Sequence, residues 1–327
     1  MNIVSETLES LAIGQPHQFR NLSIFPLRGG QAGPRDYLTL SEAFEKGLAQ
    51  ISEVSEDGSV LALKFENNAK QPVLVLDGEE LVGAKQDRIA NVTILAPAEE
   101  TITVPVSCVE AGRWNYRDRN FKPTNRAYFS QGRRRKTAAV SESLREHGVH
   151  DAKQNEVWDE VALKHMDMDI ESSTGSMADL YEQQETRITD FVDAFEAEDG
   201  QVGAVFAIGP RIEGLEVFDN AETFAEMLPK LIRSYAIDAI DRVDVLKRKP
   251  ALVAAQSFIL SLERAEMEVY PAVGLGMDVR ATAQGVVAAG LVEGERVVHL
   301  VGFTAPAKTR RHDSDEEEDE DYGSRAA

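Results

Sequence analysis

The chain has 327 residues, and its hydrophobic content of 43% is ample for one large domain or two. Its formal charge of −21 at pH 7 argues against a nucleic-acid or anionic-membrane surface, because both require clustered basic charge. The single cysteine excludes an internal disulfide and fits a reducing compartment. With neither a signal-peptide pattern at residues 1–7 nor an apolar run of about 20 residues, we expect a cytoplasmic protein without a membrane span.

The elements before residue 73 follow from short periodic patterns. Alternation over residues 18–27 predicts a strand. Residues 40–50 have Phe44 and Leu48 at helical spacing, so we predict a helix there with Ser41 as its N-cap. A second strand is predicted over residues 60–65.

Residues 73–114 contain short β-rich runs broken by Gly and Pro, which predicts three or four antiparallel strands. These strands also carry an unusual set of long polar and charged side chains for one small sheet. They are Glu79, Glu80, Lys85, Gln86, Arg88, Asn91, Cys108, Glu110 and Arg113.

Side chains two apart on a strand share a face, so Ile102, Val104, Val106, Cys108 and Glu110 are predicted to lie together. Glu110 then enters the end of a buried face, where burial raises a carboxyl pKa unless a cation lies beside it. Lys85 and Arg88 are candidate partners but lie on opposite faces of a regular strand, unless a bulge at Gly83 changes the register.

Residues 115–136 are rich in basic side chains, and Arg113 comes just before them. The basic residues are Arg117, Arg119, Lys122, Arg126, Arg133, Arg134, Arg135 and Lys136, interleaved with Tyr116, Phe121, Tyr128 and Phe129. Such a mixture can hold phosphates and stack on bases. The first interpretation is nevertheless a mobile loop that offsets an acidic body, and the second is a site for a small phosphorylated ligand.

The rest of the chain completes an α+β pattern. Helices are predicted over about 137–196, strands over 201–218, and one long central helix over 223–243 that contains Pro229. The last strands are predicted over residues 270–273, 279–283, 286–292 and 296–303. We therefore expect an antiparallel β-sheet core, formed by one large sheet or two packed sheets, with a helical middle insertion.

This pattern predicts a single domain over residues 1–308 and a tail over 309–327. Eight of the 56 acidic residues lie between positions 313 and 321. The tail has too little apolar surface to fold and is predicted to be disordered.

Several segments together resemble the ARG and Rhodanese-Phosphatase-superfamily-associated protein domain. They are GEELVGAKQDRIAN (78–91), VPVSCVEAGRW (104–114), KLIRSYAIDA (230–239), PAVGLGMDVR (271–280) and VVHL (297–300), and the resemblance covers roughly residues 11–304. It implies a link to NAD- and ADP-ribose-linked conflict systems and no established reaction.

Each candidate site residue has a structural alternative. The candidate catalytic residues are Glu79, Glu80, Cys108 and Glu110, and the candidate ligand-binding residues are Lys85, Gln86, Arg88, Asn91, Arg113 and Trp114. A carboxylate can act as general base or accept a ribose hydroxyl, and the cations can bind phosphate. Cys108 is either a buried core residue or a nucleophile with a spatial partner such as His299. Glu79 and Glu80 can instead form a charged strand end. Glu110 and Arg113 can form a structural ion pair, and Trp114 can be a residue that anchors the core.

Two functional interpretations follow. The first is an enzyme that acts on a small phosphorylated, nucleotide-derived ligand such as an NAD or ADP-ribose derivative. The second is a non-catalytic sensor or interaction domain. The six histidines show no metal-binding spacing, so no metal site is predicted. The sequence indicates neither a cofactor nor an oligomeric state.

Overall fold

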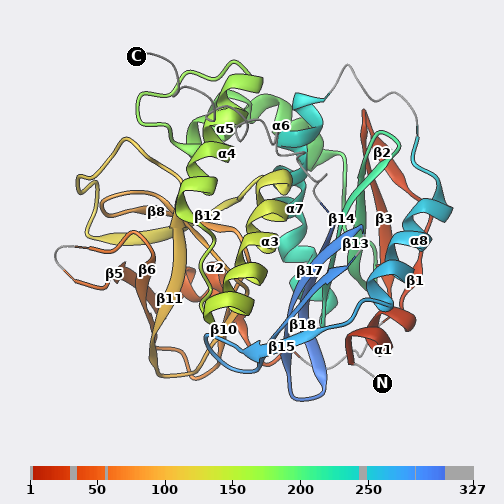
Figure 1. Cartoon of the computed structure of the whole chain (residues 1–327), viewed down its shortest axis with the longest axis horizontal. Coiled ribbons are helices and arrows are strands. Elements are labelled where there is room, and N and C mark those ends of the chain that lie inside the picture. Colours follow the sequence, from red (N-terminus) through yellow and green to blue (C-terminus); the bar gives the residue numbers. More distant parts are fainter. Residues whose placement is uncertain (1–2, 30–34, 56–57, 243–248, 284, 306–327) are drawn as a thin grey trace, which may run out of the picture.

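The computed structural model describes residues 3–29, 35–55, 58–242, 249–283 and 285–305. Over these ranges the chain forms a nine-stranded antiparallel sheet, a closed six-stranded barrel, a three-stranded sheet and eight helices. The barrel lies to the left and the large sheet to the right in Figure 1, with helices α3 (Ser130–His147) and α7 (Ala221–Asp241) between them. The α+β prediction is confirmed, and the predicted tail 309–327 lies outside the described residues.

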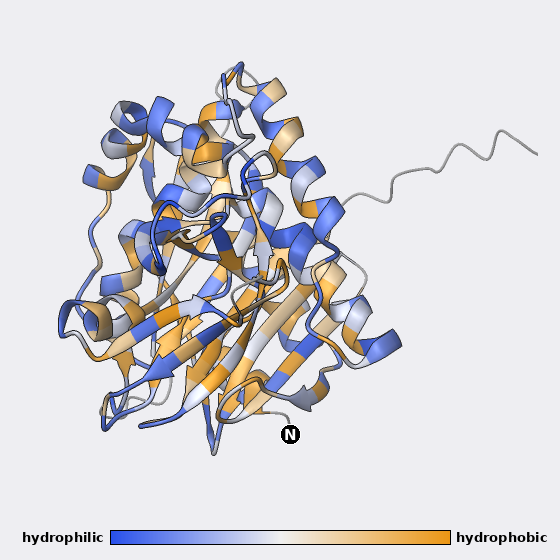
Figure 2. Cartoon of the chain, turned by 90° about the vertical axis from the view of Figure 1, so that its left-hand side faces the viewer, coloured by the Kyte–Doolittle hydropathy of each residue, from blue (hydrophilic) through white to orange (hydrophobic). Residues whose placement is uncertain are grey.

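The large sheet has a hydrophobic core on each face. Its strands, in spatial order, are β1 (Ala12–Ile13), β3 (Leu22–Arg28), β13 (Gln201–Ile208), β14 (Arg211–Phe218), β18 (Arg296–Thr304), β17 (Val286–Glu293), β16 (Met277–Ala283) and β15 (Glu268–Pro271), and β2 (His17–Phe19) pairs with β3. Along β13, Ala204 and Phe206 face one core and Val205 faces the other, as the two-residue period of a strand requires. Helices α1 (Ile3–Glu9) and α8 (Leu252–Glu263) cover the second core. Figure 2 shows hydrophobic residues concentrated along the strands.

The predicted strands of residues 73–114 divide between the barrel and the small sheet. The barrel contains β11 (Thr101–Cys108), β6 (Ala62–Asn67), β5 (Ala49–Glu53), β12 (Asn120–Ala127), β8 (Glu79–Gly83) and β9 (Arg88–Ala90), and β9 pairs with β11 to close it. The small sheet contains β10 (Ile94–Ala96), β7 (Val73–Val75) and β4 (Leu38–Thr39). Gly83 ends β8 with φ +137°, and a Cβ there would lie 2.3 Å from the Asn120 carbonyl oxygen, so only glycine fits.

Two predicted elements near the N-terminus were wrong in extent. The single strand over 18–27 is the hairpin β2–β3, which turns at Arg20 with φ +51°. The helix α2 (Leu40–Glu45) is shorter than predicted, because Gly47 adopts φ +65° and the chain then enters β5. Its N-cap is Thr39 rather than Ser41, in a capping box with Glu42.

The predicted helical insertion contains four helices: α3, α4 (Gln154–Asp167), α5 (Met177–Gln183) and α6 (Glu185–Asp193). The mobile-loop interpretation of residues 115–136 was wrong from residue 120 onward, because this stretch forms β12 and the first turns of α3. Arg133 and Lys136 are fully buried against Glu216 and Asp77. None of the described helices combines the length and hydropathy that a membrane span requires.

Candidate functional site

A groove of about 790 Å³ opens in the barrel wall between β5 and β12. These two strands pair only at Asn120↔Ser52 and Phe121↔Ile51, and their pairing stops before Pro123, which has no backbone N–H to donate. Beyond that point β12 and β5 are not paired, and residues of helices α2 and α7 complete the lining of the groove. The groove thus arises from a local interruption of strand pairing.

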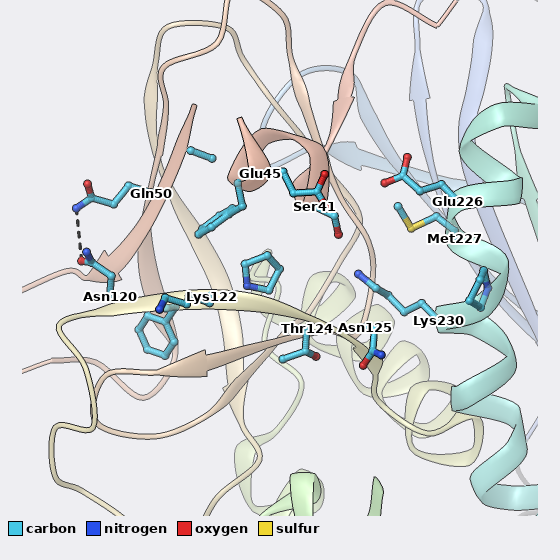
Figure 3. A pocket seen from close by; sticks show the side chains of 15 residues that line it. Ser41, Glu45, Gln50, Asn120, Lys122, Thr124, Asn125, Glu226, Met227 and Lys230 are labelled. Atoms are coloured by element: carbon cyan, nitrogen blue, oxygen red, sulfur yellow. Dashed lines mark hydrogen bonds between the residues drawn. The ribbon is translucent and has the colours of Figure 1, made fainter. Parts of the chain in front are cut away.

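The groove is lined by both polar and apolar side chains (Figure 3). The polar residues are Ser41, Glu45, Gln50, Asn120, Lys122, Thr124, Asn125, Glu226 and Lys230, and the others are Phe44, Ala49, Phe121, Pro123, Met227 and Pro229. Small-molecule sites commonly have about 300–1,000 Å³ of volume and a mostly apolar lining with a few placed polar groups. The groove matches this description in size, whereas nine of its fifteen lining residues are polar.

Glu79 lies behind the groove, where it is fully buried. One carboxylate oxygen accepts a hydrogen bond of 3.0 Å from the Leu76 N–H, and the other pairs with the ammonium of Lys230. Lys230 extends from α7 toward the groove in Figure 3. Lys230 was not among the predicted site residues, although a lysine within the apolar stripe of α7 was a usable signal.

Glu80 is also fully buried and is held from the groove side. One carboxylate oxygen accepts hydrogen bonds from the Thr124 hydroxyl at 2.8 Å and from Arg126 Nε at 2.6 Å. Thr124 itself lines the groove. Glu80 Oε1 accepts no hydrogen bond from the described part of the chain. Both predicted carboxylates of β8 therefore support the groove and already have cationic partners.

The remaining acidic candidate, Glu110, belongs to a second group with Asp87 and Arg113. Glu110 is fully buried and accepts a 2.7 Å hydrogen bond from Arg113 Nε, while Arg113 Nη2 lies 3.0 Å from Asp87 Oδ1. Burial opposes ionisation of Glu110, but its hydrogen bond to Arg113 and the charge of Arg113 hold the pKa of Glu110 below its usual range. The predicted cation beside Glu110 is thus Arg113, rather than Lys85 or Arg88.

Asp87, which was not among the predicted site residues, shares Arg113 with Glu110. Burial, followed by the negative charge of Glu110, raises the pKa of Asp87 to about 6. Its Oδ2 lies 3.8 Å from Arg117 and accepts no hydrogen bond within the described residues. Two adjacent carboxylates with pKa values moved in opposite directions are a pattern found at acid–base sites. Glu110 also accepts hydrogen bonds from Thr174 at 3.1 Å and from Arg117 at 3.5 Å, so this group is largely enclosed.

The predicted ligand-binding residues near this group have structural contacts. Gln86 donates to the Glu110 carbonyl at 2.9 Å, and Arg88 donates to Gln86 at 3.2 Å. Burial lowers the pKa of Arg88. Lys85 lies 5.2 Å from the ring centre of Trp114, which is 44% exposed, so the core-anchor alternative for Trp114 was wrong.

Cys108 is fully buried, and burial raises the pKa of its thiol. His299, its proposed activating partner, instead bonds Glu216 at 3.0 Å and Thr93 at 2.8 Å.

The expected result is that a thiol reagent labels Cys108 more than about a hundredfold more slowly in the native protein than in concentrated urea. Absorbance with a chromogenic disulfide checks this, and equal rates would restore Cys108 as a candidate nucleophile.

Asn91 belongs to neither group. Its side chain accepts a 2.8 Å hydrogen bond from Ser107 and donates one of 3.0 Å to the His150 carbonyl, and its own carbonyl accepts from Lys136. No group of three or more metal-ligating side chains occurs among the described residues. The structure therefore brings only Glu79 and Glu80, of the ten predicted residues, against the groove through Lys230 and Thr124.

The comparisons with known proteins support the family resemblance seen in the sequence and identify no ligand. A family model described as the ARG and Rhodanese-Phosphatase-superfamily-associated Protein domain matches residues 10–303. Neither the curated proteins nor the solved structures contain a match to the chain. The match spans the large sheet, the barrel and the helices between them. The chain therefore belongs to the ARG and Rhodanese-Phosphatase-superfamily-associated protein domain family.

Proposed function

We propose that the protein binds a small phosphorylated ligand derived from a nucleotide, such as an NAD or ADP-ribose derivative, in the groove between β5, β12 and α7. The observation that carries the proposal is a groove of about 790 Å³ with a lysine on β12 and a lysine on α7. Lys122 is well exposed and Lys230 is 6% exposed, so the two lysines place positive charge at different depths of the groove. An anionic group of the ligand can be bound at either depth. Phe44, Phe121 and Met227 supply apolar contact for a base or sugar.

The contacts of Glu79 and Glu80 support a binding role for the groove. Each has an ion pair with a buried or nearly buried cation, Lys230 for Glu79 and Arg126 for Glu80. This observation supports a ligand-binding or sensing domain, in which Glu79 fixes Lys230 and Glu80 fixes Thr124 at the groove.

The test is calorimetric titration of the full chain with ADP-ribose, NAD and ribose 5-phosphate. Lys122→Glu is expected to weaken binding about tenfold, because reversing a charge a few ångströms from a phosphate costs about 1–2 kcal/mol. The matched control is Lys64→Glu, which reverses a charge at a half-exposed position on β6 outside the groove lining. It should leave the affinity unchanged at physiological salt.

Equal weakening by both substitutions would show that the net charge of the chain, and not the groove, controls binding. No heat change with any of the three ligands at millimolar concentration would remove the proposal. Thermal unfolding of both variants should match that of the wild type within about 0.5 kcal/mol, since each changes an exposed side chain.

A further inference from the structure

We infer that Lys230 is a reactive amine that condenses with the C1 aldehyde of a sugar phosphate in the groove and forms an imine. The inference rests on the proposed function, because it places the ligand in the same groove. It goes beyond that function by assigning a covalent step and a nucleophile.

Lys230 has the surroundings that such a step requires. Its side chain is 7% exposed and lines the groove, so a bound ligand can reach a residue from which bulk water is largely excluded. The apolar residues Met227 and Pro229 border it on the same helix. Lysine amines that form imines in proteins are typically placed in such partly desolvated positions.

Glu79 is placed to handle the protons of the reaction. Its carboxylate contacts the Lys230 ammonium directly, and the 3.0 Å hydrogen bond from Leu76 fixes its other oxygen. Lys230 reaches it from 151 residues away in sequence, so the contact depends on α7 packing against the barrel. A carboxylate beside an amine can remove a proton from the ammonium and return it later.

The step balances without a further reagent. Glu79 takes one proton from the ammonium, and the free amine of Lys230 attacks the aldehyde carbon, which breaks the C=O π bond and gives a carbinolamine. The carbinolamine oxygen receives the nitrogen's proton and the proton held by Glu79, and it leaves as water while the C=N bond forms. The sum is one aldehyde and one ammonium converted into one protonated imine and one water.

The rest of the lining suits a polyhydroxylated phosphate. Thr124, Asn125 and Ser41 offer hydroxyl and amide groups to the sugar hydroxyls, and they lie around Lys230 in Figure 3. Lys122 is a second cation, available to a phosphate. The substrate class is therefore an aldose phosphate, or a nucleotide-linked sugar whose terminal ring opens to an aldehyde.

The experiment traps the imine. The full chain is incubated with ribose 5-phosphate and sodium cyanoborohydride, and peptide mass spectrometry measures the reduced adduct at each lysine. We expect the adduct at Lys230 to exceed that at exposed Lys64 at least tenfold, although exposure alone favours Lys64. Lys230→Arg, which keeps the positive charge but has no nucleophilic amine, should lose the trapped adduct.

The wild-type ratio decides the question even if the variant does not fold. An adduct at Lys230 no greater than at Lys64, with the carbonyl-free compound ribitol 5-phosphate still bound, overturns the inference and leaves the proposed function intact. If neither compound binds and no selective adduct forms, both are overturned. An adduct at Lys230 that excess ribitol 5-phosphate suppresses supports both.

Discussion

Arg133→Met should lower the free energy of unfolding by about 3–5 kcal/mol, the range found when one partner of a buried ion pair is removed. Arg133 is fully buried on α3 and donates to both carboxylate oxygens of Glu216, at 2.5 and 3.3 Å. Glu216 lies on β14 of the large sheet and is itself fully buried, with His299 as its other partner. Without Arg133 a buried carboxylate loses its main countercharge. Urea unfolding followed by circular dichroism measures the loss.

Arg145→Met is the matched control, because it removes the same functional group from the same helix. Arg145 and its partner Glu268 are 44% and 40% exposed, so the expected loss is below about 1 kcal/mol. Arg133→Met combined with Glu216→Gln should recover part of the stability, since no buried charge remains unpaired. Equal losses for Arg133→Met and Arg145→Met would mean that the buried pair contributes no more than an exposed one.

Features controlled by local sequence were predictable. The period-two pattern predicted that Ile102, Val104, Val106, Cys108 and Glu110 share one face. In the structure Val104, Val106 and Cys108 are buried on β11, Ile102 is partly buried, and Glu110 is buried two residues after the strand ends. The apolar stripe likewise predicted α7, which runs through Pro229. Closure of the barrel was not predictable by the same reasoning. It depends on β9 pairing with β11 and β5 pairing with β12, and neither contact leaves a periodic signal in the chain.

In the basic stretch, residues 115–136, positive charge in the sequence was a poor guide to solvent exposure in the fold. Arg133 and Lys136 are three apart on α3 and face the same buried interface, where their partners Glu216 and Asp77 come from β14 and from the residue after Leu76. Helical spacing was a signal for this shared face. Burial lowers the pKa of Lys136 to about 8, although Asp77 opposes the shift. Ion pairs between residues this distant in sequence cannot be predicted from composition. The buried cations were therefore interpreted as part of a solvent-exposed loop.

The candidate site was partly predictable for the same reason. Glu79 and Glu80 were selected because long carboxylates are unusual within short strands, and both lie behind the groove. The residues that give them a role, Lys230 and Thr124, are supplied by α7 and β12. The groove itself depends on where β12 stops pairing with β5, after Phe121. A single chain shows which residue types are unusual, whereas the fold decides which of them meet.

Asp87→Asn should raise the free energy of unfolding by about 1–3 kcal/mol above pH 7 and leave it unchanged below about pH 4. Asp87 has a pKa of about 6 in the folded chain, where its usual value is 3.8. Between these values the folded state binds more protons than the unfolded state, so stability falls as the pH rises through this window. The asparagine carbonyl can still accept from Gly83 and Arg113, and its amide replaces an oxygen that accepts no hydrogen bond within the described residues.

Glu110→Gln should lower the free energy of unfolding at neutral pH, which is the opposite of the change expected for Asp87→Asn. The contrast distinguishes the effect of the Asp87 pKa shift from a general effect of removing a negative charge. The pKa of Glu110 is lowered, chiefly by Arg113 once burial has been overcome, so its ionised form stabilises the fold above its usual pKa of 4.5. That contribution is lost as the pH falls through the lowered pKa, and the glutamine variant lacks it at neutral pH. Urea midpoints for both variants and the wild type, measured from pH 4 to pH 8, test the pair. If Asp87→Asn is less stable than the wild type at pH 8, the attraction between Asp87 and Arg113 outweighs both the burial of Asp87 and its repulsion by Glu110. Asp87 would then be a structural anion of the barrel rather than the proton-retaining member of an acid pair.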